Sequence, residues 1–475
     1  MPSFRELTAA IARPALQIAL IVACAQFMQN LDGTIIVTAL PAMATSFATT
    51  ASRMSEGITA YALAAAVCIP ASAWLADRMG TRNLFCAAIA LFTLASMACA
   101  MAASFATFIA WRLLQGGTAA MMAPVGRIIV LRNTQKRELM QMLSALVWPS
   151  LIAPVIGPPL GGFITSAASW RWIFYINLPF GIAAIVLALA VIPNHRDEQR
   201  STFDARGFLL LAIAVGCLTY GFDVAGGQRI EIMTVLALLG AACVAGYLAL
   251  RHLESARDPV VRLDALRGRA FFVACISGGG ISRAAISATP FLLPLMLQVG
   301  FGLSPLDSGL LLLVYMLANF LMKIVTNPIV RRFGMRRVLI VNGAITAAGI
   351  ASCALISPAL PAVLTGAILL LSGASRSLQF STVTYTSFAE IAPEDRSSAS
   401  VLSSLAIQVA NGVGVALAAL LLNFSRLLRH APNLTPFDFR LAFVVTGLFG
   451  ALAVFSYARL AEGTGAEVSG HMAPT

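Results

Sequence analysis

Two charged residues that could exchange a proton lie inside apolar stretches near the start of the chain. Asp32 falls in the segment 15–40, and Arg112 falls in the segment 106–131 with Gln115 one turn later. A carboxylate inside a membrane costs about 2.5–3.5 kcal/mol on insertion scales and usually marks a function. Arg112 keeps its charge and needs an acid or water, so we expect it to pair with Asp32. Asp32 is therefore either a proton carrier or a structural acid held by an arginine.

The second half of the chain has three cations inside apolar stretches and no acid at comparable depth. They are Arg283, Lys323 and Arg376. Such cations either form salt bridges across the interface between two halves or meet an anionic substrate, and both readings stay open. Polar, charged and aromatic side chains in these stretches predict a substrate cavity, and its residues are Gln29, Arg283, Gln298, Tyr315, Lys323, Arg376 and Gln379.

The composition is that of an integral membrane protein. Hydrophobic residues make up 59% of the chain and charged residues only 11%, against about 25% charged in soluble domains. Apolar runs of about 20 residues, the length of one span, recur and predict fourteen transmembrane helices and an all-α polytopic fold. Most basic residues fall in alternate loops, which predicts cytoplasmic N- and C-termini. The net charge of +12 therefore reflects topology, and no nucleic-acid partner is expected.

The cysteines and histidines do not suggest a reaction centre. The eight cysteines all fall in predicted spans, where they are expected to act as small packing residues. The four histidines fall in loops or in the tail. No Ser/His/Asp, metal-ligand or phosphate-loop constellation is visible, so the sequence predicts no metal site and no enzyme.

Two short charged turns have nearly the same sequence, which favours a role beyond anchoring the topology. Asp77-Arg-Met-Gly80-Thr-Arg82 recurs as Arg331-Arg-Phe-Gly334-Met-Arg336. Glycine permits a tight turn at a helix end. We predict a cytoplasmic latch formed by Asp77, Arg78, Gly80, Arg82, Arg331, Arg332 and Gly334.

The stretch 148–181 is apolar yet rich in proline and glycine. A helix of this composition is kinked and has a bare groove, which neighbouring helices must cover inside a membrane. The groove is either a tight packing surface or a hinge. Its weaker echo at Asn411–Gly414 lacks the prolines, which favours a directional hinge. The predicted hinge residues are Pro154, Gly157, Pro158, Gly161 and Gly162.

The repeated motifs predict two related halves with a helix pair inserted between them. Arg112-Leu-Leu-Gln115 recurs as Arg376-Ser-Leu-Gln379, in addition to the repeated turns. We therefore predict a six-helix half at 1–192, a two-helix insertion with loops at 193–269, a second six-helix half at 270–460 and a cytoplasmic tail at 461–475. Parallel halves of this kind are typical of transporters with a site between them.

Over roughly residues 15–460, the chain resembles the fourteen-span drug:proton antiporter group of the major facilitator superfamily. The matching segments are Leu31–Ile35 with Leu40-Pro41, Leu75–Gly80, Arg112 with Gln115 and Gly116, Gly157-Pro158 with Gly161-Gly162, Trp170–Pro179, and Phe203-Asp204 with Gly207. Some positions depart from the group's pattern: Ala73, Ser144 and Ala153 replace glycines, and Arg331 replaces the acid of the second turn.

The resemblance implies the major facilitator fold, with two six-helix halves and two extra central helices, and proton-driven export by alternating access. Asp32 would take up protons, Arg112 would modulate its proton affinity beside Gln115, and Asp77 with Arg78 would latch the cytoplasmic side. No cofactor is implied, because the proton gradient drives transport. The implied partners are a small-molecule substrate, protons, the lipid bilayer of the bacterial inner membrane and, as a candidate, a periplasmic adaptor protein.

These features are compatible with three functions. The favoured one is a proton-coupled antiporter that exports small amphipathic compounds, as in multidrug efflux. The alternative is an exporter of organic anions or metal-carboxylate complexes that uses Arg283, Lys323 and Arg376. A non-transporting membrane sensor is a weaker alternative, because sensors usually add a soluble domain and no loop is long enough for one.

Overall fold

The computed structural model describes residues 14–49, 54, 56–195, 202–226, 232–303, 305–430 and 434–470, and every regular element in these ranges is a helix. The chain divides into two compact units. Unit 1 comprises residues 1–220, 239–263 and 393–405, and unit 2 comprises residues 221–238, 264–392 and 406–475. The division therefore falls within three helices of the central and C-terminal regions. The domain limits at 192, 269 and 460 stay predictions.

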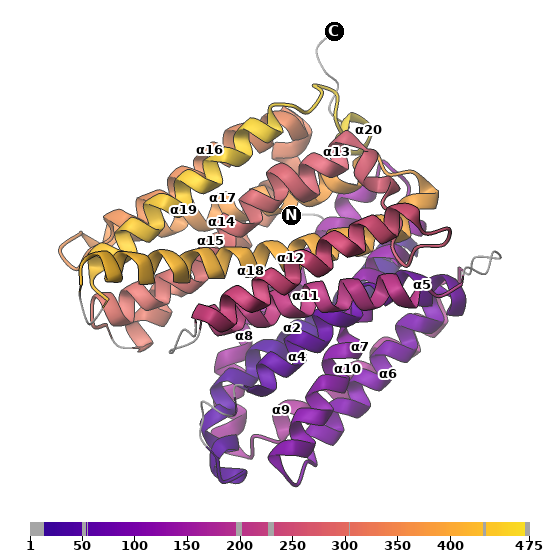
Figure 1. The fold of residues 1–475 in the computed structure, drawn as a ribbon, viewed down its shortest axis with the longest axis horizontal. Helices are drawn as coiled ribbons and strands as arrows, with labels where there is room; N and C mark the ends of the chain where they lie inside the picture. The colour runs from indigo at the N-terminus through magenta and orange to yellow at the C-terminus, as the bar shows by residue number, and fades with distance from the viewer. Residues whose placement is uncertain are drawn as a thin grey trace, which may run out of the picture. The chain divides into compact units, whose positions relative to one another are not determined.

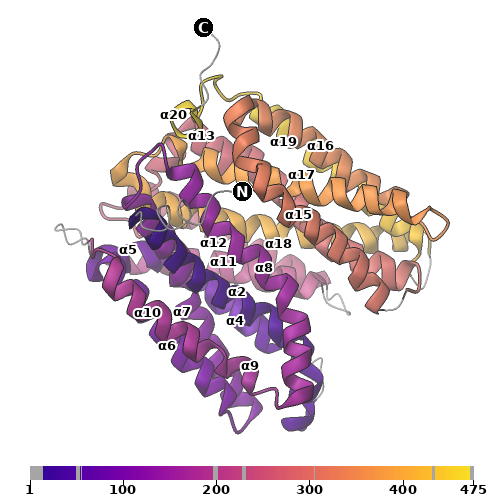
Figure 2. The same cartoon turned by 180° about the vertical axis from the view of Figure 1, so that it is seen from behind.

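Unit 1 contains the first eight helices with described bounds, drawn in indigo to magenta in Figure 1. They are α2 (Pro14–Ser46), α4 (Glu56–Cys68), α5 (Ala71–Met79), α6 (Thr81–Ala100), α7 (Phe105–Arg132), α8 (Leu139–Ala167), α9 (Trp172–Tyr175) and α10 (Asn177–Val191). Helix α2 packs against α8 and α10, and α7 packs against α4 and α6. These long helices run alongside one another in both views (Figures 1 and 2).

Three helices are divided between the units: α11 (Ala205–Gly226), α12 (Ile232–Ser255) and α18 (Arg396–Leu428). Unit 2 also contains α13 (Arg269–Phe272), α14 (Gly278–Leu295), α15 (Pro305–Phe333), α16 (Met335–Ser352), α17 (Ala362–Ala389), α19 (Pro436–Tyr457) and α20 (Ala466–Ser469). Short 3-10 turns lie at Asp264–Arg267, Cys353–Leu355 and Pro393–Asp395, and π-helical turns lie at Val273–Ser277 and Met296–Gly300. Here α15 packs on α17, and α19 packs on α14 and α16.

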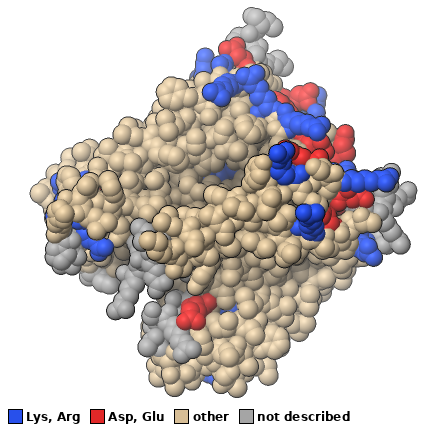
Figure 3. All heavy atoms as spheres, viewed as in Figure 1, with Lys and Arg blue, Asp and Glu red and all other residues tan. Residues whose placement is uncertain are grey.

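The helices have the length and composition of membrane spans. Twelve helices of the described residues qualify, or thirteen if α4 and α5, bent by 63°, form one span. Pro70 lies at this bend, as expected for a residue without an amide hydrogen. The chain is therefore a multi-pass membrane protein, while fourteen spans were expected. Helix α8, 29 residues long, is not among the twelve. Most of the face in Figure 3 is uncharged, and charged side chains gather at helix ends.

The two repeated turns have the same backbone geometry. Gly80 has φ +87° and Gly334 has φ +77°, a conformation that L side chains rarely adopt. The Gly80 amide donates to the Ala76 carbonyl, and the Gly334 amide donates to the Val330 carbonyl, each at 2.9 Å. Each turn thus ends one helix and starts the next within a single residue, which holds the charges around it in a fixed arrangement.

Candidate proton-coupling site and buried cations

The charged pair expected from the sequence is formed inside unit 1. Arg112 Nη1 donates to Asp32 Oδ2 at 2.8 Å, and the two side chains are almost fully buried. Gln115 Nε2 donates to Asp32 Oδ1 at 2.9 Å, while its own oxygen accepts from Arg112 Nη1 at 2.6 Å. Helix α7 places Arg112 and Gln115 on one face, three residues apart. All three predicted proton-coupling residues therefore lie in one network.

Other elements of unit 1 complete this network. Asn177, the first residue of α10, donates to Asp32 Oδ1 at 3.0 Å and to Ser96 Oγ of α6 at 2.9 Å. Arg112 Nε donates to the Gly57 carbonyl at 3.1 Å. The Arg112 guanidinium also lies 4.5 Å from the centroid of the Tyr61 ring, a cation–π contact. Helices α7 and α10 thus donate to the carboxylate that α2 carries, and α4 contacts the arginine that pairs with it.

A glycine allows the α4–α7 contact that brings Tyr61 to Arg112. A Cβ added to Gly116 would lie 2.2 Å from the Tyr61 carbonyl oxygen, a distance that real side chains do not reach. The backbone of α4 therefore packs directly on α7 one turn after Arg112. Any larger residue at Gly116 would separate the ring from the guanidinium.

The arrangement gives the buried acid and the buried arginine one another as counter-charge. Asp32 accepts hydrogen bonds from Arg112, Gln115 and Asn177, and the bond from the guanidinium is of the strong, charge-assisted kind. Separating the two side chains would leave a buried charge without a counter-charge, which is costly.

Asn177 and Tyr61 were absent from the predicted site. Asn177 is the only amide in the apolar segment WIFYINLPFGIAAIVLALAV, and an isolated polar residue in a span is a signal that could have identified it. Tyr61 had no such signal, because a tyrosine in an apolar helix is usually a packing residue. Its role appears only from the contact with Arg112.

Unit 2 contains the three cations expected in its spans, of which Arg283 and Lys323 are buried and Arg376 is half-buried. Arg283 of α14 is 1% exposed, and none of its three guanidinium nitrogens has a hydrogen-bond partner in the described part of the chain. Its Cζ lies 5.6 Å from the centroid of the Phe380 ring on α17. Lys323 of α15 is 3% exposed and donates to Ser381 Oγ of α17. None of the described carboxylates forms an ion pair with either cation.

Arg376 and the other predicted cavity residues are distributed over several places. The Arg376 guanidinium lies 5.7 Å from the centroid of the Tyr315 ring, so Arg376 and Tyr315 belong with Lys323 on the α15–α17 pair. Gln379 is fully buried and accepts from Asn342 of α16 at 2.9 Å. Gln298, at the end of α14, is exposed and donates to Ser308. Gln29 lies on α2 in unit 1.

The predicted latch residues are brought together only in part. Asp77 pairs with Arg132 of α7 at 3.1 Å, and Arg132 also donates to Ser397 Oγ at 2.9 Å. Arg132 was not among the predicted latch residues. Arg78 is exposed and stacks on Trp74 with 5.3 Å between Cζ and the ring centroid. In unit 2, Arg331 and Arg332 are exposed at the end of α15.

Arg82 and Gly334 complete the predicted latch set, and each lies beside its own turn. Arg82 Nε donates to Asn83 Oδ1 at 3.5 Å, a long contact at the start of α6. Gly334 forms the turn between α15 and α16, next to Arg336, which pairs with Glu462 at 2.9 Å. The Asp77–Arg132 pair is therefore the charged contact that joins a predicted latch residue to another helix of unit 1.

The glycines of the predicted hinge separate into two groups. A Cβ on Gly157 would lie 2.3 Å from Thr34 Oγ1, and one on Gly161 would lie 2.5 Å from the Ile35 carbonyl oxygen, so both face α2. Gly162 has open space around it. The side chains of Pro154 and Pro158 lie outside the described residues. The expected bare groove is therefore present, and α2 covers it.

The same kind of contact recurs in unit 2. A Cβ on Gly414 of α18 would lie 2.1 Å from the Ala284 carbonyl oxygen of α14. Gly373 of α17 packs on the Tyr315 carbonyl oxygen just as Gly116 packs on that of Tyr61. Helices α7 and α17 are both 28 residues long, with Gly116 and Gly373 at the same position. In this register Arg376 lies about two turns beyond the position of Arg112.

Comparisons with known proteins agree on one family. The sequence pattern of the Major Facilitator Superfamily matches residues 22–387 and 275–471. A protein of Escherichia coli strain K12 that carries the name multidrug resistance protein MdtD is 35% identical over 452 residues, which cover 94% of each chain.

Solved structures with low sequence identity share the fold. The human organic anion transporter MFSD10 has a TM-score of 0.65 at 15% identity, covering 94% of this chain and 100% of its own. The proton:xylose symporter XylE has a TM-score of 0.65 at 14% identity, covering 95% and 97%.

Proposed function

Because this chain belongs to the Major Facilitator Superfamily, we propose that it is a proton-coupled antiporter. It exports small amphipathic compounds by alternating access, as in multidrug efflux. The observation that carries the proposal is the Asp32–Arg112 pair, 2.8 Å apart and buried in unit 1. A buried acid with a single competing cation is a proton site whose occupancy depends on conformation.

The coupling follows from that competition. While Arg112 holds Asp32, the carboxylate stays ionised. When Arg112 withdraws, a proton neutralises Asp32 at small electrostatic cost, and its release restores the ion pair. Gln115 and Asn177 keep the carboxylate oriented in both states, because each donates to Oδ1 and leaves Oδ2 to Arg112 or the proton. One proton per cycle through Asp32 is the simplest coupling that this geometry supports.

The proposal is tested by measuring proton release on substrate addition in inverted membrane vesicles. Asp32→Asn keeps the size of the side chain and loses the titrating group, so we expect substrate-driven alkalinisation to fall to background. Glu390→Gln is the matched control, because Glu390 is an exposed acid at the end of α17 and should have no effect. Full coupled transport in folded Asp32→Asn protein would rule out the carrier role.

The same proposal includes the topology expected for such an antiporter. We place the protein in the bacterial inner membrane with cytoplasmic termini and fourteen spans. The bent pair α4–α5 and the 29-residue helix α8 supply the thirteenth and fourteenth. Export needs no cofactor, because the proton gradient supplies the energy, and no enzymatic step is proposed. A periplasmic adaptor stays a candidate partner. Cysteine accessibility on the two sides of the membrane tests the orientation.

The buried cations of unit 2 favour a second candidate substrate class, organic anions or metal-carboxylate complexes. Arg283 has no polar partner among the described residues, and a buried guanidinium without a counter-charge is costly. A carboxylate substrate would provide one, with hydrogen bonds in the planar geometry that arginine prefers. Lys323→Met and Arg376→Met should then weaken binding of di- and tricarboxylates and spare lipophilic cations. The reverse pattern would exclude this candidate.

A further inference from the structure

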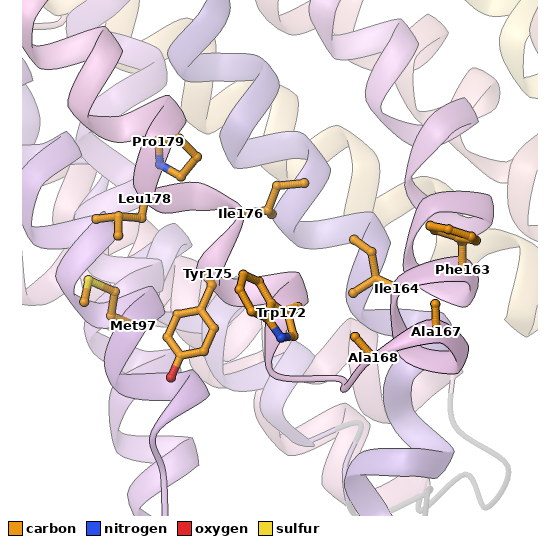
Figure 4. A pocket seen from close by; sticks show the side chains of 10 residues that line it. All are labelled: Met97, Phe163, Ile164, Ala167, Ala168, Trp172, Tyr175, Ile176, Leu178 and Pro179. Carbon is orange, nitrogen blue, oxygen red and sulfur yellow. The ribbon is translucent and has the colours of Figure 1, made fainter.

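An apolar groove of about 730 Å³ lies in unit 1, and none of its lining residues is Asp32, Arg112, Gln115 or Asn177. It is formed where α8 ends, α9 follows and α10 begins, beside the end of α6 (Figure 4). Its lining includes Met97 of α6, Phe163 and Ala167 of α8, Trp172 and Tyr175 of α9, and Pro179 of α10. The volume is in the range of small-molecule sites, roughly 300–1,000 Å³.

The walls of the groove suit a hydrocarbon chain. Phe163 is 70% exposed and Trp172 is 57% exposed, so the groove opens outward in a multi-pass membrane protein. Small-molecule sites usually add several polar groups that converge on the ligand. Here the only polar atoms of the lining side chains are those of Trp172 and Tyr175, whose rings pack edge to face at 5.7 Å. Tryptophan and tyrosine are typical of the headgroup level of a bilayer.

A cation, Arg171, lies next to these aromatic residues in the sequence. Arg171 directly precedes Trp172, and its guanidinium stacks on the Trp170 ring with 4.5 Å between Cζ and the centroid. Arg171 is half-buried, and no acid of the described residues forms an ion pair with it. Arginine binds phosphate through two parallel hydrogen bonds. The site thus combines an apolar groove with a cation on the connector between two of its lining residues, Ala168 and Trp172.

We propose that this groove is a binding site for an anionic phospholipid, with one acyl chain between α8 and α9 and its phosphate on Arg171. Charge complementarity at Arg171 distinguishes this occupant from a lipophilic cation, which the guanidinium would repel.

The short helix α9 connects the site to the proton-coupling network. Trp172 and Tyr175 face the groove, while the next residue inward, Phe174, is 1% exposed and its ring lies 5.9 Å from Arg112 Cζ. The Phe174 carbonyl also accepts from Ser96, which in turn accepts from Asn177. A bound lipid would therefore hold α9, and with it one wall of the Arg112 site. This consequence rests on the proposed function, but lipid binding does not.

Binding is tested with the full chain in nanodiscs of phosphatidylcholine that contain phosphatidylglycerol with a photoreactive acyl chain. After illumination, mass spectrometry locates the label. We expect label in residues 163–179, and we expect excess unlabelled phosphatidylglycerol, but not phosphatidylcholine, to displace it. Arg171→Gln should lower this labelling about fivefold, the loss expected for one cation at an anionic surface.

A second variant tests the contribution of the groove to lipid binding independently of Arg171. Ala167→Trp fills the groove and should abolish labelling of 163–179, whereas Leu94→Trp, a substitution at a 60% exposed position of α6, should leave it unchanged. Equal labelling of wild type and Arg171→Gln would overturn the proposal. So would displacement of the label by tetraphenylphosphonium, because the groove would then be a substrate site. A failure of lipid labelling leaves the Asp32→Asn result untouched, so the two proposals are tested separately.

Discussion

Unit 1 pairs the buried arginine of a span, Arg112, with a buried acid, Asp32, whereas the two buried cations in spans of unit 2, Arg283 and Lys323, form no ion pair with a described acid. Asp32 accepts from Arg112, Gln115 and Asn177 in unit 1. Arg283 of unit 2 is just as deeply buried, yet it has no polar partner in the described residues. The glycine contacts that pack the helices, at Gly116 and Gly373 and at Gly161 and Gly414, are nevertheless alike. The two units therefore share these glycine contacts and differ in how their buried cations are paired.

The sharpest test of this difference replaces the two arginines. Arg112→Met leaves Asp32 buried without its cation, and we expect a loss of about 3–5 kcal/mol in stability. Arg283→Met removes a charge that has no hydrogen-bond partner among the described residues, so stability should stay equal or rise. Thermal unfolding of the purified variants measures both. If both variants were destabilised equally, the charge of Arg283 would be compensated by groups of the protein itself, and the two units would not differ in this respect.

Glycine substitutions examine the shared scaffold. Gly157→Leu places a side chain against Thr34 of α2 and should cost about 1–3 kcal/mol by overpacking, trapping one conformation and stopping transport. Gly162→Leu, which meets open space, is the matched control and should leave transport intact. Gly414→Leu should resemble Gly157→Leu if both contacts only pack helices. Unchanged transport in a folded Gly157→Leu protein would count against the hinge.

A smaller effect is expected in the insertion between the halves. Burial alone would raise the pKa of Asp204, but hydrogen bonds from the Gly207 amide, His252 and the Val260 amide outweigh it and lower that pKa below its usual value. Asp204 therefore stabilises the fold above its unfolded pKa of about 3.9, and this contribution disappears as pH falls through the lower folded value.

Asp204→Ala removes the acceptor that caps the start of α11 and should cost about 1 kcal/mol at neutral pH, and the difference should shrink only below about pH 4. The measurement compares melting temperatures in a His252→Gln background, so that the imidazole does not titrate. A difference that vanished already near pH 6 would assign the effect to another group.

The smallest effect concerns the charged turns. The Asp77–Arg132 pair is more buried than the Arg336–Glu462 pair, in which the glutamate is 88% exposed. Exposed pairs contribute about 0.2–1 kcal/mol. The loss of stability in Arg132→Met should therefore be near the upper end of that range, and the loss in Arg336→Met near the lower end. Chemical denaturation at low and high salt measures both. If Arg336→Met lost more stability than Arg132→Met, the stronger charged contact, and with it the latch, would lie in unit 2 instead of unit 1.

How far the sequence predicts the site depends on the residue. Asp32, Arg112 and Gln115 could be assigned because charge inside an apolar span has few uses, and their helical spacing places them on one face. Arg132 was missed because an arginine at a helix end usually faces solvent, and only the tertiary fold brings Asp77 to it. The repeated Arg-Leu-Leu-Gln and Arg-Ser-Leu-Gln motifs suggested equivalent positions, but the packing of Gly116 and Gly373 sets a register about two turns away.

Prediction of the fold from the sequence has the same limit: it identifies the type of element but not its tertiary contacts. Span length and apolar composition predicted an all-helical membrane protein correctly, since both follow from bilayer thickness. Gln379 is hydrogen-bonded to Asn342 of α16, a contact that the sequence did not predict, and its place in a substrate cavity stays a prediction. An amide in a helix of mixed polarity has neighbours on every side, and sequence periodicity does not say which one it meets.

Arg283, which has no hydrogen-bond partner among the described residues, also bears on how the chain enters the membrane during synthesis. An arginine at mid-span costs about 2.5–3.5 kcal/mol on insertion, and α14 adds Pro290 and Pro294. The helices that cover α14, including α17 and α19, are translated later. We therefore expect α14 to remain at the insertion machinery until those helices arrive, whereas α12, whose most apolar window is only 22% buried, can enter the lipid alone. We thus expect Arg283 to affect when α14 leaves the insertion machinery.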